Sequence, residues 1–204
     1  MRINKKKFIY LISPNKIYPE FYHDLNQVLR TGKVALFQLR LKKYSLKQKI
    51  VIGKKIQQIC KKNNIKFIVN DDPILSKTLN ADGCHLGQKD MDIKNARKII
   101  GKKIIGVTCH NSIKLAKAAI KENADYIAFG AFFSTKTKKV IFKADIKILN
   151  KIKKLTKTPI VAIGGINFDN YKKLLLNNAN LLAISSYVWN NKKYKPLETI
   201  VKIK

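Results

Sequence analysis

Short runs of apolar residues recur along the chain, and the segments between them carry apolar residues at helical spacing. The runs are continuous rather than alternating, which is typical of strands buried on both faces in a parallel sheet. The predicted strands lie at 8–12, 34–39, 66–70, 83–86, 104–108, 126–130, 159–165 and 181–185. The predicted helices lie at 21–29, 46–60, 73–79, 93–100, 113–119, 146–155 and 170–176.

Helix start signals support several of these segments. A Gln48 side chain three residues after a serine predicts a capping box, and Pro73 stands at a first helical position. The candidate N-cap residues are Ser45, Asp72, Asp92 and Asp169.

Repeated strand and helix units imply right-handed crossovers and parallel pairing. Eight such units in 204 residues predict a single (β/α)8 TIM barrel domain spanning residues 1–204. An open doubly wound sheet is the alternative. Because no G-x-G-x-x-G follows the first strand, the usual reason to prefer a dinucleotide fold is missing.

The composition adds a large positive charge to this picture. The formal net charge is +31, which would suit binding to nucleic acid or to an anionic membrane. However, only four basic residues are arginines, Arg2, Arg30, Arg40 and Arg97. Arginine reads base edges and grips phosphate with a planar fork, so we interpret the lysine excess as compositional drift over a solvated surface. A basic nucleic-acid-binding barrel stays open as a remote alternative.

The cysteines and the amino-terminal segment bear on location. Three cysteines without a C-x-x-C motif argue against a disulfide framework and a structural zinc site. The basic head is followed by an apolar run of five residues, 8–12, which is shorter than a signal core. No stretch approaches the roughly 20 apolar residues of a membrane span. We therefore expect a cytoplasmic protein without a membrane partner.

Polar side chains close the second and third predicted strands. The carboxyl ends of barrel strands carry the chemistry of this fold, so these residues are candidates for a site. Gln38, Arg40 and Lys42 alternate along the chain and so are expected to point together at the mouth. Asn70 and Asp71 end the third strand, although the same sequence also makes a good turn and helix cap.

A second carboxylate follows the fourth predicted strand. Asp90 would lie near Asp71 if the two strands are neighbours. Two carboxylates beside cationic side chains suit a Mg²⁺ ion that bridges a diphosphate and keeps several waters.

The histidines and cysteines of this region are read differently. His85 lies in an apolar run and is expected to be packed rather than catalytic. His110, which follows Thr108 at the end of the fifth strand, is the better candidate for catalysis. Cys84 and Cys109 are expected to pack as small apolar residues.

The stretch "GAFFSTKTKK" (130–139) ends an apolar run in hydroxyl and ammonium groups that could hold a small anion. Loops after the seventh and eighth strands are the usual phosphate site of this fold. The residues gathered there are Thr135, Thr137, Lys138, Gly164, Gly165, Ser185 and Ser186.

Taken in order, six segments resemble thiamine phosphate synthase, in the superfamily that also holds the thiazole tautomerase. They are "QLRLK", "VNDD", "ADGCHLGQKDM", "IIGVTCHN", "ADYIAFGAFFSTKTKK" and "AIGGI". The resemblance implies a transferase that couples 4-amino-2-methyl-5-hydroxymethylpyrimidine diphosphate with a thiazole phosphate or its carboxylate. The products would be thiamine monophosphate and diphosphate, and the cofactor would be Mg²⁺. A homo-oligomeric state is left open.

The resemblance also implies roles for individual residues. Mg²⁺ would be bound by Asp71 and Asp90. The pyrimidine diphosphate would contact Gln38, Arg40, Lys42, Asn70, Thr108 and Lys138. The thiazole phosphate would be held by Thr135, Thr137, Gly165 and Ser185, with Ile184 as a further substrate-binding residue. The residues expected to act in catalysis, by stabilising the departing diphosphate, are Arg40, Lys42 and Lys138.

The chain departs from the family's pattern mainly on the thiazole side. Thr108 stands where serine is usual, Leu41 replaces an acidic residue, and Ala131 and Ser134 replace a small-proline pattern. The segment "VIFKAD" lacks an expected glycine, and the last strand is one residue short, which leaves the choice between Ser185 and Ser186 open.

The thiazole tautomerase is the alternative within the same fold, and it needs acid–base chemistry but no metal. His110 would matter most for that reaction. Against it, the chain keeps Asp71, Asp90, Arg40 and Lys42, which a metal-free isomerase does not need.

Overall fold

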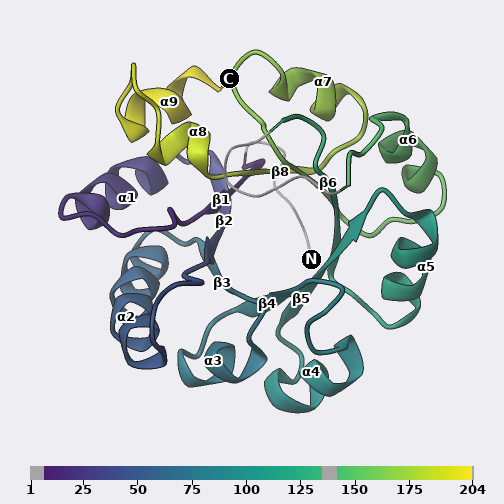
Figure 1. Cartoon of the computed structure of the whole chain (residues 1–204), viewed down its shortest axis with the longest axis horizontal. Coiled ribbons are helices and arrows are strands. Elements are labelled where there is room, and N and C mark those ends of the chain that lie inside the picture. Colours follow the sequence, from purple (N-terminus) through teal and green to yellow (C-terminus); the bar gives the residue numbers. More distant parts are fainter. Residues whose placement is uncertain (1–6, 135–141, 204) are drawn as a thin grey trace.

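Eight parallel strands close into a barrel in sequence order, and β1 completes the circle by pairing with β8 (Figure 1). The computed structural model describes residues 7–134 and 142–203. The strands are β1 (Ile9–Ile12), β2 (Val34–Leu39), β3 (Lys66–Asn70), β4 (Gly83–Leu86), β5 (Ile104–His110), β6 (Tyr126–Gly130), β7 (Ile160–Ile163) and β8 (Leu181–Ile184). The predicted (β/α)8 barrel is confirmed.

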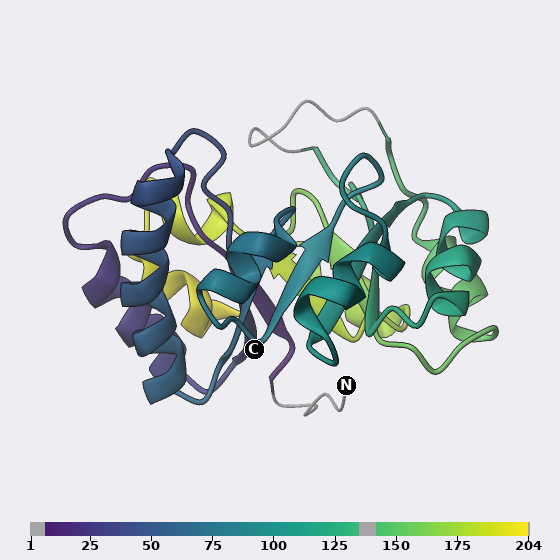
Figure 2. The same cartoon turned by 90° about the horizontal axis from the view of Figure 1, so that it is seen from below.

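Helices surround the barrel and cover the outer faces of the strands (Figures 1 and 2). They are α1 (Phe21–Arg30), α2 (Leu46–Lys62), α3 (Pro73–Thr78), α4 (Ile93–Ile100), α5 (Ile113–Lys121), α6 (Lys147–Lys153), α7 (Tyr171–Leu176), α8 (Ser186–Trp189) and α9 (Pro196–Lys202). The sequence pattern did not predict α8 and α9, which have 4 and 7 residues. Among the described residues, no helix is both long and apolar enough to cross a membrane.

Most of the predicted helix caps are confirmed. The side chains of Ser45, Asp72 and Asp92 each accept a hydrogen bond from the backbone N–H three residues later. The prediction for Asp169 is wrong, because the N-cap of α7 is Asn170 and its side chain makes no capping bond. Instead, the side-chain oxygen of Asn167 accepts from the backbone N–H groups of Asp169 and Asn170, so a turn organises this helix start.

Alternate residues of the strands build two apolar layers. One layer packs between the sheet and the helices, and the other fills the barrel. The barrel-filling layer is formed by Tyr10, Ile12, Leu36, Ile68, Tyr126, Ala128, Val161, Leu181 and Ala183. The Tyr126 ring crosses to β5, where a Cβ on Gly106 would lie 1.8 Å from its Cζ. Glycine at this position therefore makes room for a large ring inside the barrel.

Candidate active site at the carboxyl ends of the strands

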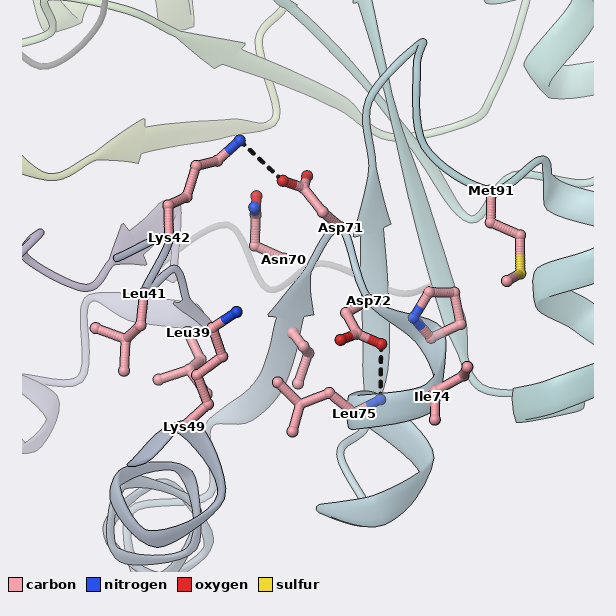
Figure 3. Close-up of a pocket in the computed structure, with 12 residues that line it drawn as sticks. Leu39, Leu41, Lys42, Lys49, Asn70, Asp71, Asp72, Ile74, Leu75 and Met91 are labelled. Atoms are coloured by element: carbon pink, nitrogen blue, oxygen red, sulfur yellow. Dashed lines mark hydrogen bonds and ion pairs between the residues drawn. The ribbon is translucent and has the colours of Figure 1, made fainter. Parts of the chain in front are cut away.

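Lys42 and Asp71 meet at the carboxyl ends of β2 and β3. Nζ of Lys42 lies 3.0 Å from Oδ2 of Asp71, and Figure 3 shows the two side chains pointing toward each other with Asn70 beside them. The backbone N–H of Asp71 donates to the carbonyl oxygen of His85 at 2.8 Å, which ties this residue to β4. Asp71 has a φ of 64°, a conformation that Asp tolerates better than most residues.

Asp90 completes a carboxylate pair with Asp71. The two carboxyl groups lie close enough for each to shift the pKa of the other, and the backbone N–H of Gly87 donates to Oδ2 of Asp90 at 2.6 Å. The expectation that these residues lie together is therefore confirmed. Parallel neighbours present their carboxyl ends at one edge, which is why loops distant in sequence meet here.

The surroundings of this pair shift the two pKa values in opposite directions. Burial would raise the pKa of Asp71, but hydrogen bonds to Lys42 and Asp90 and the charge of Lys42 outweigh it and bring the pKa below its ordinary value. Burial raises the pKa of Asp90, and the hydrogen bond and charge of Asp71 raise it further against the lowering effect of Gly87. The pKa of Asp71 thus lies below its ordinary value and that of Asp90 above it, as expected for two close carboxyl groups that repel each other when both are charged.

The donor set fits Mg²⁺ better than a metal that needs an all-protein cage. Within the described residues, no three His, Cys, Asp or Glu side chains gather in a way that could hold a metal ion. Mg²⁺ commonly uses one or two carboxylates and completes its shell with water and phosphate oxygens. Asp71 and Asp90 are such a pair.

Arg40 adds a second cation beyond the end of β2. Burial lowers its pKa, and the nearby charge of Asp71 partly offsets this effect. Its backbone N–H donates to Oγ of Ser13 at 2.8 Å, and Nη1 donates to Oδ1 of Asn15 at 3.2 Å. The guanidinium is thus held from the loop after β1 while it remains near Asp71.

Gln38 lies deeper than Arg40 and Lys42. It is only 3% exposed, and its Nε2 donates to the hydroxyl of Tyr10 at 2.8 Å inside the barrel. The expectation that Gln38, Arg40 and Lys42 point together at the mouth therefore needs correction. β2 ends at Leu39, so only Gln38 keeps the inward direction of the strand.

His85 is packed within the barrel, as expected. It is 8% exposed, its Nδ1 lies 2.9 Å from the hydroxyl of Tyr126, and its Nε2 lies 2.8 Å from Oγ1 of Thr108. Burial lowers the pKa of His85 to about 4, and the charge of Asp71 opposes this only in part. The ring is therefore uncharged near neutral pH.

Sequence reasoning missed Tyr10 and Tyr126, whose hydroxyl groups lie 2.8 Å apart in the barrel. A usable signal was present, because a tyrosine in a strand buried on both faces must find a partner for its hydroxyl. Cys84 and Cys109 are buried, which confirms their packing role.

His110 ends β5 with a φ of 52°, and its ring lies 4.3 Å from that of Phe142. The ring is thus packed on an aromatic side chain at the mouth. This contact gives no support to a role for His110 as an acid or base.

The thiazole side of the predicted site is only partly described. Thr135, Thr137 and Lys138 lie outside the described residues. Gly165 has a φ of 64°, and a Cβ there would lie 2.3 Å from the carbonyl oxygen of Ser134, so this glycine permits close packing of two loops. Oγ of Ser185 donates to the carbonyl oxygen of Ser13 at 3.1 Å. Ile184 is buried in the layer between sheet and helices, so its side chain faces away from the mouth.

A pocket of about 400 Å³ opens beside Asp71, between the ends of β2 and β3 and the helices α2 and α3 (Figure 3). Its walls combine apolar side chains with the polar residues Lys42, Lys49, Asn70, Asp71 and Asp72.

Comparison with known proteins gives one consistent result. The family model for thiamine monophosphate synthase matches residues 9–188. A thiamine-phosphate synthase of Pelagibacter ubique is 65% identical over 208 residues and covers 100% of both chains. One of Erythrobacter litoralis is 40% identical over 187 residues, or 89% of this chain and 88% of the relative. A solved thiamine phosphate pyrophosphorylase from Pyrococcus furiosus superposes with a TM-score of 0.85 at 31% identity, covering 98% of this chain and 94% of that chain.

Proposed function

The chain belongs to the thiamine monophosphate synthase family, and from this premise we propose how its strand ends carry out the reaction. Its activity is that of a transferase that makes thiamine phosphate. The proposed substrates are 4-amino-2-methyl-5-hydroxymethylpyrimidine diphosphate and a thiazole phosphate. The observation that carries this assignment is the cluster of Lys42, Asp71 and Asp90 at the barrel mouth.

Asp71 and Asp90 would hold a Mg²⁺ ion, which when bound neutralises negative charge on the diphosphate. Lys42 would exchange its ion pair with Asp71 for the diphosphate. Lys42 and Arg40 would turn to the diphosphate oxygens. Because Arg40 is partly shielded from water, its charge acts more strongly there than in bulk solvent.

The bond that breaks joins the methylene carbon of the pyrimidine to the diphosphate oxygen, and the electron pair leaves with that oxygen. The ring nitrogen of the thiazole then donates its lone pair to the methylene cation and forms the new carbon–nitrogen bond. The protein contributes positioning and charge stabilisation rather than a nucleophile. Consistent with this, burial raises the pKa of the Cys109 thiol to about 12.

The thiazole phosphate would be held by Thr135, Thr137, Gly165 and Ser185, with Lys138 turned to the diphosphate. This half of the proposal rests on the resemblance of the motifs and on the position of Gly165 and Ser185 after β7 and β8. No observation favours the tautomerase alternative, since His110 packs on Phe142 and both carboxylates are retained.

One assay tests the proposal directly. The purified protein is incubated with both precursors and Mg²⁺, and thiamine monophosphate and diphosphate are quantified together. Matched reactions contain a chelator, or the thiazole carboxylate phosphate without the pyrimidine. Equal release of both products only when both substrates and metal are present supports the proposal. Isomerisation of the thiazole without metal, and no coupled product, would instead establish the tautomerase.

A further inference from the structure

The barrel interior contains a continuous chain of hydrogen bonds that the proposed mechanism does not use. Nε2 of Gln38 donates to Oη of Tyr10 at 2.8 Å, and Oη of Tyr10 lies 2.8 Å from Oη of Tyr126. Oη of Tyr126 lies 2.9 Å from Nδ1 of His85, and Nε2 of His85 lies 2.8 Å from Oγ1 of Thr108. The chain links β2 to β5 through side chains of β1, β6 and β4.

Gln38 decides which group donates in every hydrogen bond of this series. An amide nitrogen only donates, so the Tyr10 hydroxyl accepts from Gln38. If Tyr126 also donated to Tyr10, the O–H of Tyr10 would lack an acceptor in a site that is 1% exposed. An unmade buried hydrogen bond costs about 1–3 kcal/mol, so Tyr10 donates to Tyr126 instead.

The same donor order assigns a tautomer to the imidazole of His85. The Tyr126 hydroxyl accepts from Tyr10 and donates to Nδ1 of His85, which makes Nδ1 the acceptor of an uncharged ring. Nε2 therefore carries the ring proton and donates it to Oγ1 of Thr108. The Thr108 hydroxyl, once it accepts from His85, keeps its own proton for a different acceptor.

We propose that this chain fixes the Thr108 hydroxyl as a hydrogen-bond donor to the diphosphate, with His85 and Tyr126 as positioning residues. Thr108 lies near the carboxyl end of β5, at the same end of the barrel as Asp71 and Asp90. A diphosphate offers only acceptors, so a hydroxyl that presented its lone pairs would repel it. The identity of the ligand rests on the proposed function. The direction of the hydrogen bonds follows from the structure and does not depend on that function.

The tautomer of His85 is the first test, and it requires no ligand. Long-range proton–nitrogen correlation spectra of the unliganded protein should show a protonated Nε2 and a bare Nδ1. The signals are assigned by elimination with His23→Asn and His110→Asn, since the chain has three histidines. A protonated Nδ1 would reverse the chain and overturn the proposal, whatever the activity of the protein.

The second test measures the affinity for inorganic diphosphate with Mg²⁺ by calorimetry. Tyr126→Phe removes the donor to Nδ1 of His85, so the ring can accept from Thr108 instead. We expect about tenfold weaker diphosphate binding, in line with the roughly 1.5–3 kcal/mol of a charge-assisted hydrogen bond. Tyr10→Phe is the matched control, because Tyr126 then still has His85 as its acceptor. That variant should bind diphosphate within about twofold of the unaltered protein.

A double-mutant cycle separates positioning from simple loss of packing. In a Thr108→Val background, Tyr126→Phe should weaken diphosphate binding no further, although it should still lower the unfolding temperature. Equal affinity of Tyr126→Phe and the unaltered protein would refute this proposal alone. Failure of the unaltered protein to bind diphosphate at all would refute the proposed function and this inference with it.

Discussion

Nζ of Lys42 lies 3.0 Å from Oδ2 of Asp71, so a cation proposed to hold the diphosphate is paired with a carboxylate proposed to hold Mg²⁺. The two side chains are 55% and 30% exposed, and pairs this open contribute at most about 1 kcal/mol to stability. The pair therefore breaks at little cost when ligands bind. In the structure, the pair keeps Lys42 at the carboxyl ends of β2 and β3.

The carboxylate pair is expected to make activity depend on a divalent ion. Asp71→Asn and Asp90→Asn should each abolish turnover, because both remove a negative oxygen ligand from the ion. Unfolding temperatures should stay close to that of the unaltered protein, and Glu122→Gln, at an exposed residue that ends α5 away from the site, should keep full activity. The metal assignment is wrong if Asp90→Asn turns over normally in Mg²⁺-depleted buffer.

Thr137 and Lys138 should act on different substrates, Thr137 on the thiazole phosphate and Lys138 on the diphosphate. Thr137→Ala removes a hydroxyl–phosphate contact worth roughly 1.5–3 kcal/mol and should raise the KM for the thiazole substrate about tenfold or more. Lys138→Ala should lower kcat by roughly 10²–10³ at saturating thiazole phosphate, by analogy with other lost electrostatic donors. Steady-state kinetics with each substrate varied in turn decide the matter. If both variants alter only the KM for the thiazole, the division does not exist.

The surface charge is expected to be unimportant for catalysis. Lys61 and Lys62 at the end of α2, and Lys172 and Lys173 on α7, are exposed and lie on helices outside the barrel. Reversing these four charges to Glu should change solubility and leave kcat nearly unchanged. A folded variant with a large fall in kcat would count against this interpretation.

His85 should make stability depend on pH. Its pKa in the folded protein is lowered to about 4, so the unfolded chain, with an ordinary value near about 6.5, binds the proton more readily. The stability that neutral His85 contributes to the free energy of unfolding is fully present above about pH 6.5. It is lost as the pH falls toward 4, and the loss amounts to roughly 3 kcal/mol.

Urea unfolding at several pH values measures this dependence. His23→Asn, which changes an exposed histidine, should retain it, and His85→Gln should flatten it between about pH 6.5 and 4. The same slope in the His85→Gln variant would show that other groups cause the acid sensitivity.

Gly106→Ala should destabilise the barrel and disturb its interior chain. The added Cβ would lie 1.8 Å from Cζ of Tyr126, and overpacking of this kind costs roughly 1–3 kcal/mol or more. Gly101→Ala is the control, because its φ of 61° brings backbone strain but no atom lies within 4 Å. Both variants should unfold at lower urea, but only Gly106→Ala should also weaken diphosphate binding. Unchanged diphosphate binding in Gly106→Ala would show that the position of the Tyr126 ring does not affect the site.

Sequence alone determined the architecture and the edge at which the site lies. The runs at 34–39, 66–70, 83–86 and 126–130 match β2, β3, β4 and β6 at both ends, because a continuous apolar run is a local signal of a strand buried on both faces. The meeting of Asp71 and Asp90 was also predictable, since neighbouring parallel strands share a carboxyl edge.

Only the tertiary structure decided which inward side chains share a layer. Tyr10 and Tyr126 are 116 residues apart, and His85 and Thr108 come from two further strands. Their contacts depend on the register and stagger of every strand pair around the barrel, and a shift of one residue would turn each side chain to the other face. Neither composition nor spacing contains that register. The barrel was therefore readable from local pattern, and the hydrogen-bond chain inside it was not.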